Sequence, residues 1–239
     1  MNLCIDQGNS RTKVALFKDG VIVKNLLYRS FTSVDVERLF SLYPITDSIV
    51  SSVANMEPAV INALNRLSKR FVLFDHLTPL PIANCYQTPE TLGHDRIAAA
   101  VGAAHLCPAQ NLLIVDAGSA VTYDFVSVER GYLGGNIAPG IKMRLKALHE
   151  YTSRLPLVEK EGEIPAFGYD TETAIRSGVI TGIGHEIDGY INAIREKYGD
   201  VLVFLTGGDE KTLKNRIKNH IFADKNLVAK GLNRILLNY

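Results

Sequence analysis

Short runs of β-branched and aliphatic residues dominate the first 28 positions of the chain. The runs LCID, TKVALFK and VIVKNLLY are separated by the polar stretch QGNS and by Asp19-Gly20. An Asp-Gly pair between two such runs favours a tight hairpin turn. The pattern therefore predicts a three-stranded meander at the start of the chain.

The periodicity then alternates between that of helices and that of buried strands. A proline-containing loop over 77–92 is expected to lead into an alanine-rich helix over 95–106, which begins with Asp95 and Arg96. The elements expected before this loop are a helix over 33–42 capped by Ser33, a strand over 47–53, a helix over 57–67 and a strand over 71–75.

The same order of elements restarts near residue 110. The expected elements are strands over 111–118, 120–127 and 131–140, helices over 141–151 and 171–198, a strand over 201–209, a polar helix, a strand near Leu227 and a short helix. Four glycines within 171–198 predict a break or small-residue packing. Two copies of one α/β pattern predict two domains, 1–110 and 111–239.

Each copy opens with an Asp-x-Gly turn directly after its first apolar run. The two turns are IDQG, which contains Asp6, and VDAG, which contains Asp116. Aspartate and glycine are common in turns for local reasons, so one turn alone would indicate little. Two such turns in matching strand context favour a role in ligand binding over a purely local role in the turn. They also predict two domains that face each other across a binding cleft.

The residues around these turns suit a phosphate group held with a metal ion. Backbone N–H groups can approach a phosphate closely at Gly8, which has no Cβ atom. Asp6 and Asp116 would repel a phosphate, but their carboxylates can hold Mg²⁺ directly or through water. Neutral or positive donors follow in both turns: Asn9, Ser10, Lys13 and Ser119.

A third glycine turn, LTGGDE (205–210), lies where the expected strand over 201–209 ends. Gly207 and Gly208 would let a base or a ribose lie against the backbone, beside the N-terminus of a helix. The chain contains no GxxxxGK[ST] phosphate loop and no GxGxxG after a first strand. A bound nucleotide would therefore be held in another way.

Composition excludes several classes of protein. The 239 residues carry a net charge of +1 without a block of basic residues, which argues against nucleic acid or an anionic membrane as a partner. No apolar run reaches the roughly 20 residues of a membrane span, and the opening MNLCIDQGN does not resemble a signal peptide. Three cysteines without CxxC spacing predict reduced, mostly buried thiols in a cytoplasmic protein.

Five motifs in order resemble those of type III pantothenate kinases, within the actin-like ATPase and sugar-kinase superfamily. DQGNSRTK, YQTPETLGHDR, DAGSAVTYD, GGNIAPG and DTETAIRSG resemble D-x-G-N-T-x-x-K, Y-x-x-P-x-x-L-G-x-D-R, D-x-G-T-A-x-T-x-D, G-G-x-I-x-P-G and N-T-x-x-A-I-x-x-G. The resemblance runs from residue 2 to about residue 210. Ser10 and Ser119 stand where threonine is usual, Asp170 replaces asparagine, and His94 fills a variable position.

The resemblance implies duplicated actin-like (ribonuclease H-like) domains, each with a mixed central sheet flanked by helices, facing across a nucleotide cleft. It implies transfer of the γ-phosphoryl group of ATP to pantothenate, which gives 4′-phosphopantothenate and starts coenzyme A biosynthesis. By resemblance, Asp95 accepts the hydroxyl proton, Asp116 binds K⁺ or NH₄⁺, and Asp6 belongs to the Mg²⁺ shell. A homodimer with pantothenate at the subunit interface is also implied. The residues that resemble the pantothenate-binding set are Tyr86, Gly93, His94, Asp95, Arg96 and Thr171.

Structural roles remain open for most of these residues. Asp95 can simply cap its helix, and Thr171 can cap the next one, with Thr173 close enough to be confused with it. Arg96 can form a surface salt bridge, and Tyr86 can be a core side chain. Two other functions also remain open: a different small-molecule kinase or phosphohydrolase of the superfamily, and a non-catalytic nucleotide-binding regulator.

Overall fold

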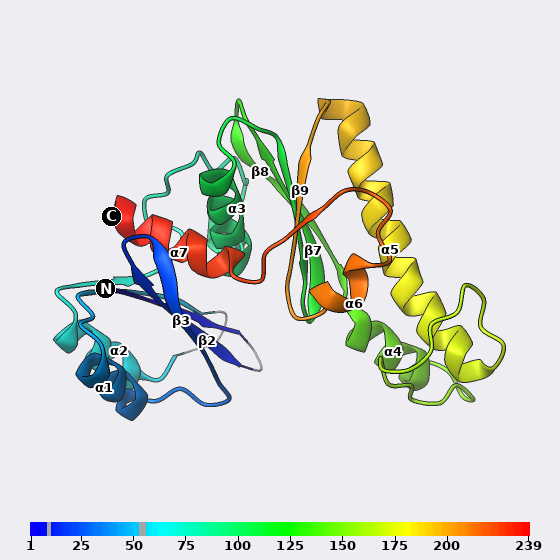
Figure 1. Cartoon of the computed structure of the whole chain (residues 1–239), viewed down its shortest axis with the longest axis horizontal. Helices are drawn as coiled ribbons and strands as arrows, with labels where there is room; N and C mark the ends of the chain where they lie inside the picture. The colour runs from blue at the N-terminus through cyan, green and yellow to red at the C-terminus, as the bar shows by residue number, and fades with distance from the viewer. Residues whose placement is uncertain (9–10, 53–55) are drawn as a thin grey trace. The chain divides into compact units, whose positions relative to one another are not determined.

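The computed structural model describes residues 1–8, 11–52 and 56–239 and divides the chain into two compact units (Figure 1). The first unit contains Met1–Pro108 together with Asn226–Tyr239, and the second contains Ala109–Lys225. Each unit is built on a five-stranded mixed sheet with flanking helices.

The first unit confirms the predicted N-terminal meander. Its strand order is β3-β2-β1-β4-β5, in which β1–β2 and β2–β3 pair antiparallel and β1–β4 and β4–β5 pair parallel. Asp19 and Gly20 both have positive φ, 51° and 77°, as a two-residue hairpin turn requires. The strands are β1 (Asn2–Gln7), β2 (Thr12–Lys18), β3 (Val21–Tyr28), β4 (Asp47–Ser52) and β5 (Arg70–Leu73).

Helices cover both faces of this sheet. The helices α1 (Ser33–Leu42) and α2 (Pro58–Leu67) bury one face, where Leu3, Ile5 and Val50 form a core with their apolar side chains. The other face carries α3 (His94–Leu106), preceded by the short helix η1 (Pro89–Thr91), and α7 (Leu227–Asn238). Side chains alternate along a strand, so neighbouring residues of β1 and β4 face opposite helix pairs.

The second unit repeats the sheet. Its strand order is β10-β9-β6-β7-β8, with β6–β7 and β7–β8 antiparallel and β6–β9 and β9–β10 parallel. In the core of the second unit, isoleucines along one side of the helix over Thr171–Tyr198 are fully buried. The elements are β6 (Leu112–Ala117), β7 (Ala120–Ser127), β8 (Gly131–Pro139), α4 (Ile141–Glu150), α5 (Thr171–Tyr198), β9 (Leu202–Thr206), α6 (Glu210–Lys214) and β10 (Phe222–Ala223).

The duplication extends to individual positions of the strands. Asp6 is the fifth residue of β1, and Asp116 is the fifth residue of β6. Each aspartate pairs with one antiparallel and one parallel neighbouring strand in the same arrangement. The repeated acidic turn is therefore a repeated structural position.

Several sequence expectations differ from the structure at the ends of elements. Residues 226–239, expected in the second domain, belong to the first unit because α7 packs on α3 and β1. The strand expected near Leu227 was wrong: β10 lies at Phe222–Ala223, and Leu227 begins α7. The N-cap of α1 is Thr32 and not Ser33, because the Thr32 side chain forms a capping box with Asp35.

The long helix α5 is unbroken despite its glycines. At Gly184 a Cβ atom would lie 2.6 Å from the carbonyl oxygen of Arg216, so this position requires glycine for close packing. Gly178, Gly182 and Gly189 have no atom within 4 Å of an added Cβ. No helix in the described part of the chain has the length and apolar character needed to cross a membrane.

Candidate active site

The acidic turn of the first unit places Asp6 near the end of β1. The residue is 9% exposed, and its Oδ2 atom lies 3.9 Å from Lys13 Nζ. The Gly8 N–H donates a 3.1 Å hydrogen bond to the carbonyl oxygen of Arg11, which closes the turn into β2. The predicted donors Asn9 and Ser10 lie outside the described residues.

The Asp6 carboxyl group is buried, and among the described residues Lys13 is the cation that forms an ion pair with it. Burial raises its pKa from 3.8 to about 6, the Lys13 ammonium lowers it, and the carboxylate of Asp95 raises it further. Lys13 compensates weakly because its side chain is 56% exposed to water. A buried oxygen ligand short of counter-charge suits a divalent cation, which prefers carboxylate oxygens.

We expect an Asp6→Asn variant to be more stable than the parent protein at pH 7.5 in the absence of ligands. The folded state holds the Asp6 proton more tightly than the unfolded chain, so stability falls as pH rises from 3.8 to about 6. A pKa raised over that interval corresponds to roughly 3 kcal/mol at most. Denaturant unfolding at pH 4 and pH 7.5 measures the effect, and an equal difference between the two proteins at both pH values would contradict it.

The N-terminus of α3 gathers the predicted acceptor residues of the first unit. Asp95 is the second residue of the helix, and its Oδ1 atom accepts a 2.9 Å hydrogen bond from the Arg96 N–H. A Cβ atom at Gly93 would lie 2.7 Å from the same Oδ1 atom, so glycine leaves room for this carboxylate. The His94 ring lies 5.2 Å from the ring of Phe74.

Arg96 and Tyr86 form a second contact at this helix end. Arg96 is only 6% exposed, so it is not a surface salt-bridge residue. Its guanidinium carbon lies 5.9 Å from the centre of the Tyr86 ring, and that ring is half-buried, not part of the core. The N-cap of α3 is Gly93, so Asp95 does not occupy the cap position and binds an amide one residue further on.

The acidic turn of the second unit is bridged to the start of α4. The Gly118 N–H donates to the carbonyl oxygen of Ala120 at 3.0 Å, and the Gly140 N–H donates to that of Ser119 at 3.1 Å. A Cβ atom at Gly140 would lie 2.5 Å from the carbonyl oxygens of Gly118 and Ser119. The glycine therefore allows the two backbones to meet, and the Ser119 side chain remains exposed.

The Gly-Gly turn after β9 lies against Asp116. Gly207 has φ of +100°, and an added Cβ atom would lie 2.4 Å from the Ala117 carbonyl oxygen and 2.5 Å from Asp116 Oδ1. Gly207 thus makes space for Asp116, whereas Gly208 is exposed with no atom within 4 Å of an added Cβ. Of these two glycines, Gly208 has the open side, and Gly207 is packed against the Asp116 turn.

A hydrogen-bond network that the sequence did not reveal supports this turn. Arg144 Nε donates to the carbonyl oxygen of Pro139 at 2.7 Å, directly before Gly140, and its Nη2 donates to Glu186 Oε2 at 2.8 Å. The other Glu186 oxygen accepts from the hydroxyl group of Tyr123 at 2.6 Å, which links β7, α4 and α5. The sequence does not predict these contacts, because the spacing of polar residues along two helices does not show which of them meet.

Lys160 forms an ion pair with Asp209 that the sequence does not predict. Its Nζ lies 2.6 Å from Asp209 Oδ1, and the Asp209 N–H donates to the Ala117 carbonyl oxygen at 2.9 Å. The bridge raises the pKa of Lys160, chiefly through the hydrogen bond to Asp209. It joins the loop before α5 to the Gly-Gly turn.

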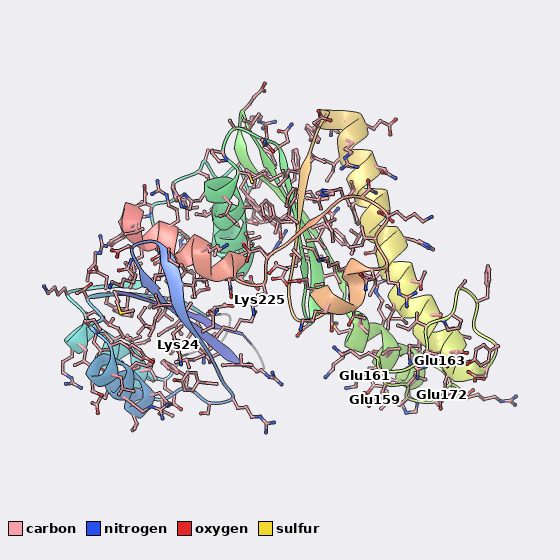
Figure 2. All side chains as sticks on the ribbon, viewed as in Figure 1. Lys24, Glu159, Glu161, Glu163, Glu172 and Lys225 are labelled. Atoms are coloured by element: carbon pink, nitrogen blue, oxygen red, sulfur yellow. The ribbon has the colours of Figure 1, made fainter. Side chains whose placement is uncertain are left out.

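Thr171 is exposed at the first residue of α5, but it is not the cap. Asp170 is the N-cap, and its Oδ1 atom accepts a 2.8 Å hydrogen bond from the N–H of buried Thr173 in a capping box. The cap function is thus accounted for without Thr171. Arg176 holds the preceding loop by donating to the carbonyl oxygens of Glu159 and Glu163, and acidic side chains crowd this end of the helix (Figure 2).

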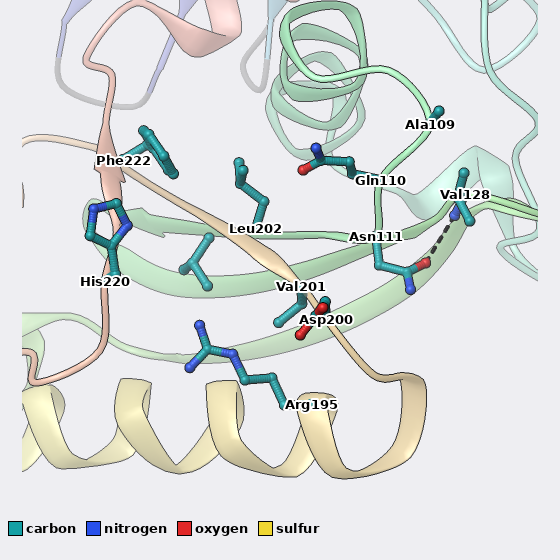
Figure 3. A pocket seen from close by; sticks show the side chains of 11 residues that line it. Ala109, Gln110, Asn111, Val128, Arg195, Asp200, Val201, Leu202, His220 and Phe222 are labelled. Atoms are coloured by element: carbon teal, nitrogen blue, oxygen red, sulfur yellow. Dashed lines mark hydrogen bonds between the residues drawn. The ribbon is translucent and has the colours of Figure 1, made fainter.

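A groove of about 680 Å³ lies elsewhere in the second unit (Figure 3). Its lining includes Asn111 before β6 and Asp200 before β9, together with Arg195, His220 and Phe222. These positions are at the opposite ends of the strands from Asp116 and Gly207. The groove contains none of the predicted site residues.

The structure brings the predicted residues together within each unit. In the first unit, Asp6 is close enough to Asp95 for the two carboxylates to interact. In the second, Gly207 and Gly118 both lie against Asp116. One cysteine expectation was wrong, because only Cys4 is buried, while Cys85 is exposed and Cys107 half-buried.

Comparison with known proteins assigns the family. A model of the type III pantothenate kinase family matches residues 2–193. Type III pantothenate kinases from Bacteroides fragilis and Phocaeicola vulgatus are 50% and 46% identical, over 100% and 99% of this chain and 98% of each relative. A solved structure from Campylobacter jejuni, described as a candidate Baf family transcriptional activator, is 26% identical with a TM-score of 0.62 over 99% of this chain and 98% of that one.

More distant structures share the fold alone. A glucokinase from an Antarctic psychrotroph is 10% identical, with a TM-score of 0.52 over 100% of this chain and 99% of that one. The two mixed sheets and this likeness show the predicted actin-like fold. The match of the family model and the identity to full-length relatives show that the chain belongs to the type III pantothenate kinase family.

Proposed function

We infer that the chain is an ATP-dependent pantothenate kinase, which transfers the γ-phosphoryl group of ATP to the primary hydroxyl group of pantothenate. The product, 4′-phosphopantothenate, is the starting compound of coenzyme A biosynthesis. The observation that carries this function is the pair of carboxylates in the first unit, buried Asp6 of β1 and half-buried Asp95 at the start of α3, which are close enough to interact. The family model that matches residues 2–193 gives this pair its meaning. Phosphoryl transfer needs this kind of site, because positioning and charge neutralisation supply most of the catalysis.

We propose that each acidic turn contributes to nucleotide binding. A kinase of this fold uses a divalent metal with ATP, and Mg²⁺ beside Asp6 fits a buried carboxylate that exposed Lys13 compensates only weakly. Backbone N–H groups near Gly8 and the hydroxyl groups of Ser10 and Ser119 would face phosphate oxygens. Asn9, Lys13, Gly207 and Gly208 complete the proposed ATP-binding set. Asp116 is the proposed ligand of K⁺ or NH₄⁺, with room for its carboxylate made by glycines.

We propose that Asp95 orients the acceptor hydroxyl group and takes its proton late in the transfer. Its second oxygen remains for this role because Oδ1 accepts the Arg96 N–H. The Arg96 guanidinium can pair with the carboxylate of pantothenate, and Tyr86 supports it through its ring. Gly93, His94 and Thr171 complete the proposed pantothenate-binding set.

A homodimer is part of this proposal. Tyr151, Phe167 and Tyr169 are 86%, 90% and 70% exposed in the segment that leads to Thr171. Exposed aromatic side chains gathered in one segment are typical of an interface. Light scattering should give twice the chain mass of 26.3 kDa, and a monomer at micromolar concentration would contradict it.

The three free cysteines support a proposed cytoplasmic location.

The activity is tested by coupled measurement of ADP release. We expect turnover with pantothenate and none with a panel of sugars, and we expect K⁺ or NH₄⁺ to raise the rate relative to Na⁺. Turnover with sugars alone would refute pantothenate as the acceptor. Nucleotide binding without turnover of any acceptor would favour a regulatory protein.

We expect an Arg144→Ala variant to bind ATP more weakly, with KM for ATP raised about 5-fold to 10-fold and KM for pantothenate nearly unchanged. The substitution removes the hydrogen bond to Pro139 and leaves Glu186 without its cation, so the turn containing Ser119 loses support. Lys142→Ala, an exposed position on the same helix, is the matched control. Equal KM values for ATP in both variants would show that the network is only structural.

A further inference from the structure

The hydroxyl group of Ser51 is buried without a hydrogen-bond partner. Ser51 lies in β4, is 0% exposed, and its Oγ atom has no partner among the described residues. Most buried polar side-chain atoms in proteins are paired, because an unpaired hydroxyl group loses its water without compensation. An unpaired buried hydroxyl group near a candidate site therefore suggests that it gains its hydrogen-bond partner when the site is occupied.

Ser51 is the direct neighbour of Asp6 in the sheet. The parallel pairing of β1 with β4 places Asp6 opposite Ser51, at the strand separation of about 4.8 Å. Register partners in a sheet point to the same face. Rotation of the Ser51 side chain can therefore bring its hydroxyl group to the Asp6 carboxylate.

The face on which they lie is fixed by the neighbouring residues. Ile5 and Val50 point into the core under α1 and α2. Asp6 and Ser51 follow them by one residue, so they point to the face covered by α3 and α7. The same face carries the N-terminus of α3, where Asp95 lies.

The second unit repeats this arrangement independently. The parallel pairing of β6 with β9 places Asp116 opposite Thr206, which is 2% exposed. Both units thus set a buried hydroxyl residue beside the turn aspartate, on the parallel neighbouring strand. β-strand propensity does not favour a hydroxyl group over an apolar β-branched side chain at this shared, buried position.

We propose that Ser51 is a positioning residue of the nucleotide site, whose hydroxyl group donates a hydrogen bond to the Asp6 carboxylate when metal and nucleotide are bound. The inference rests on the proposed function of Asp6. A donor to one carboxylate oxygen fixes the orientation of the other, and partners of this kind tune the affinity of a ligating carboxylate. Glycine, alanine or valine at this position would leave Asp6 free to rotate.

The test compares four variants by isothermal titration calorimetry with ADP at a series of Mg²⁺ concentrations. We expect Ser51→Ala to weaken binding of Mg²⁺-ADP about 10-fold and to raise the Mg²⁺ concentration needed for half-saturation. Ser51→Thr, which reproduces the residue at position 206, should retain binding within about 3-fold. KM for pantothenate should stay unchanged.

Two other buried serines serve as matched controls. Ser48 lies on the opposite face of β4 and shares a 2.6 Å hydrogen bond with Ser68, so Ser48→Ala should affect folding stability and not Mg²⁺-ADP binding. Ser177 in α5 is buried with an unpaired Oγ atom, so Ser177→Ala reports on loss of an unpaired hydroxyl group elsewhere.

The result for Ser51→Ala tests the role of Ser51 separately from the proposed pantothenate kinase activity. Unchanged Mg²⁺-ADP binding in Ser51→Ala would overturn the role of Ser51 even if the chain phosphorylates pantothenate. Weakened binding in that variant would support it even if pantothenate is not the acceptor. Should Ser51→Ala fail to fold, Ser51→Cys is measured in the same way, because it keeps the shape of serine and has only a weak donor. Weakened Mg²⁺-ADP binding in Ser51→Cys would support the role of Ser51, and unchanged binding would overturn it.

Discussion

An Asp95→Asn variant is expected to lose about 10²-fold or more in kcat for phosphorylation of pantothenate. General base catalysis contributes roughly 10²-fold to 10⁴-fold, and an amide can neither take the hydroxyl proton nor orient it in the same way. The fold should be retained, because an asparagine oxygen can still accept the Arg96 N–H hydrogen bond. KM for ATP should change little, since Asp95 belongs to the proposed acceptor site.

The Asp95 prediction has a readout that does not depend on turnover. The Asp95 carboxylate raises the pKa of Asp6, so the Asp6 pKa should fall below its value of about 6 in the variant, as measured by NMR titration. Glu57→Gln is the matched control, because Glu57 is an exposed acid at the start of α2 with no side-chain cap bond. Undiminished phosphorylation of pantothenate by Asp95→Asn would rule out the proposed mechanism.

A Gly231→Ala variant should have the largest effect on stability. An added Cβ atom at Gly231 would lie 1.7 Å from the carbonyl oxygen of Ala98, and one at Gly102 would lie 2.3 Å from that of Leu227. The backbones of α3 and α7 are therefore in contact, and a methyl group forces the helices apart. We expect a loss of at least about 3 kcal/mol in the free energy of unfolding.

The matched control for Gly231 is Gly189→Ala. Gly189 also lies within a helix, but an added Cβ atom meets no atom within 4 Å. Alanine should stabilise α5 there by about 0.5–1 kcal/mol through helix propensity. Urea unfolding of both variants measures the contrast. A Gly231→Ala variant with unchanged stability would mean that α7 does not pack on α3 as described.

The sequence predicts the sheets well because β-rich runs and tight turns are locally encoded. TKVALFK, VIVKNLLY and the Asp19-Gly20 turn between them specify a hairpin without help from distant residues. The place of α7 could not be predicted in this way. Its apolar face fits any complementary groove, and only the paired glycines Gly102 and Gly231 indicate which helix it meets.

The site was predicted in part for the same reason. The sequence predicts Asp6 and Asp116 because each directly follows an apolar run at the same position of a repeat. Contacts across long separations were not found, such as those of Arg144 with Glu186 and of Lys160 with Asp209. Ser51 was not singled out because its importance comes from the register between β1 and β4, which no single segment displays.

The return of α7 to the first unit has a consequence for synthesis on the ribosome. Residues 109–225 emerge before residues 226–239, so the second unit is complete while the first still lacks a helix. Domains often fold from the N-terminus onward during translation, but here the unit that starts first must finish last. Until α7 has been synthesised, the side of α3 that it covers stays exposed, and transiently exposed apolar surface of this kind makes an incomplete chain prone to aggregation.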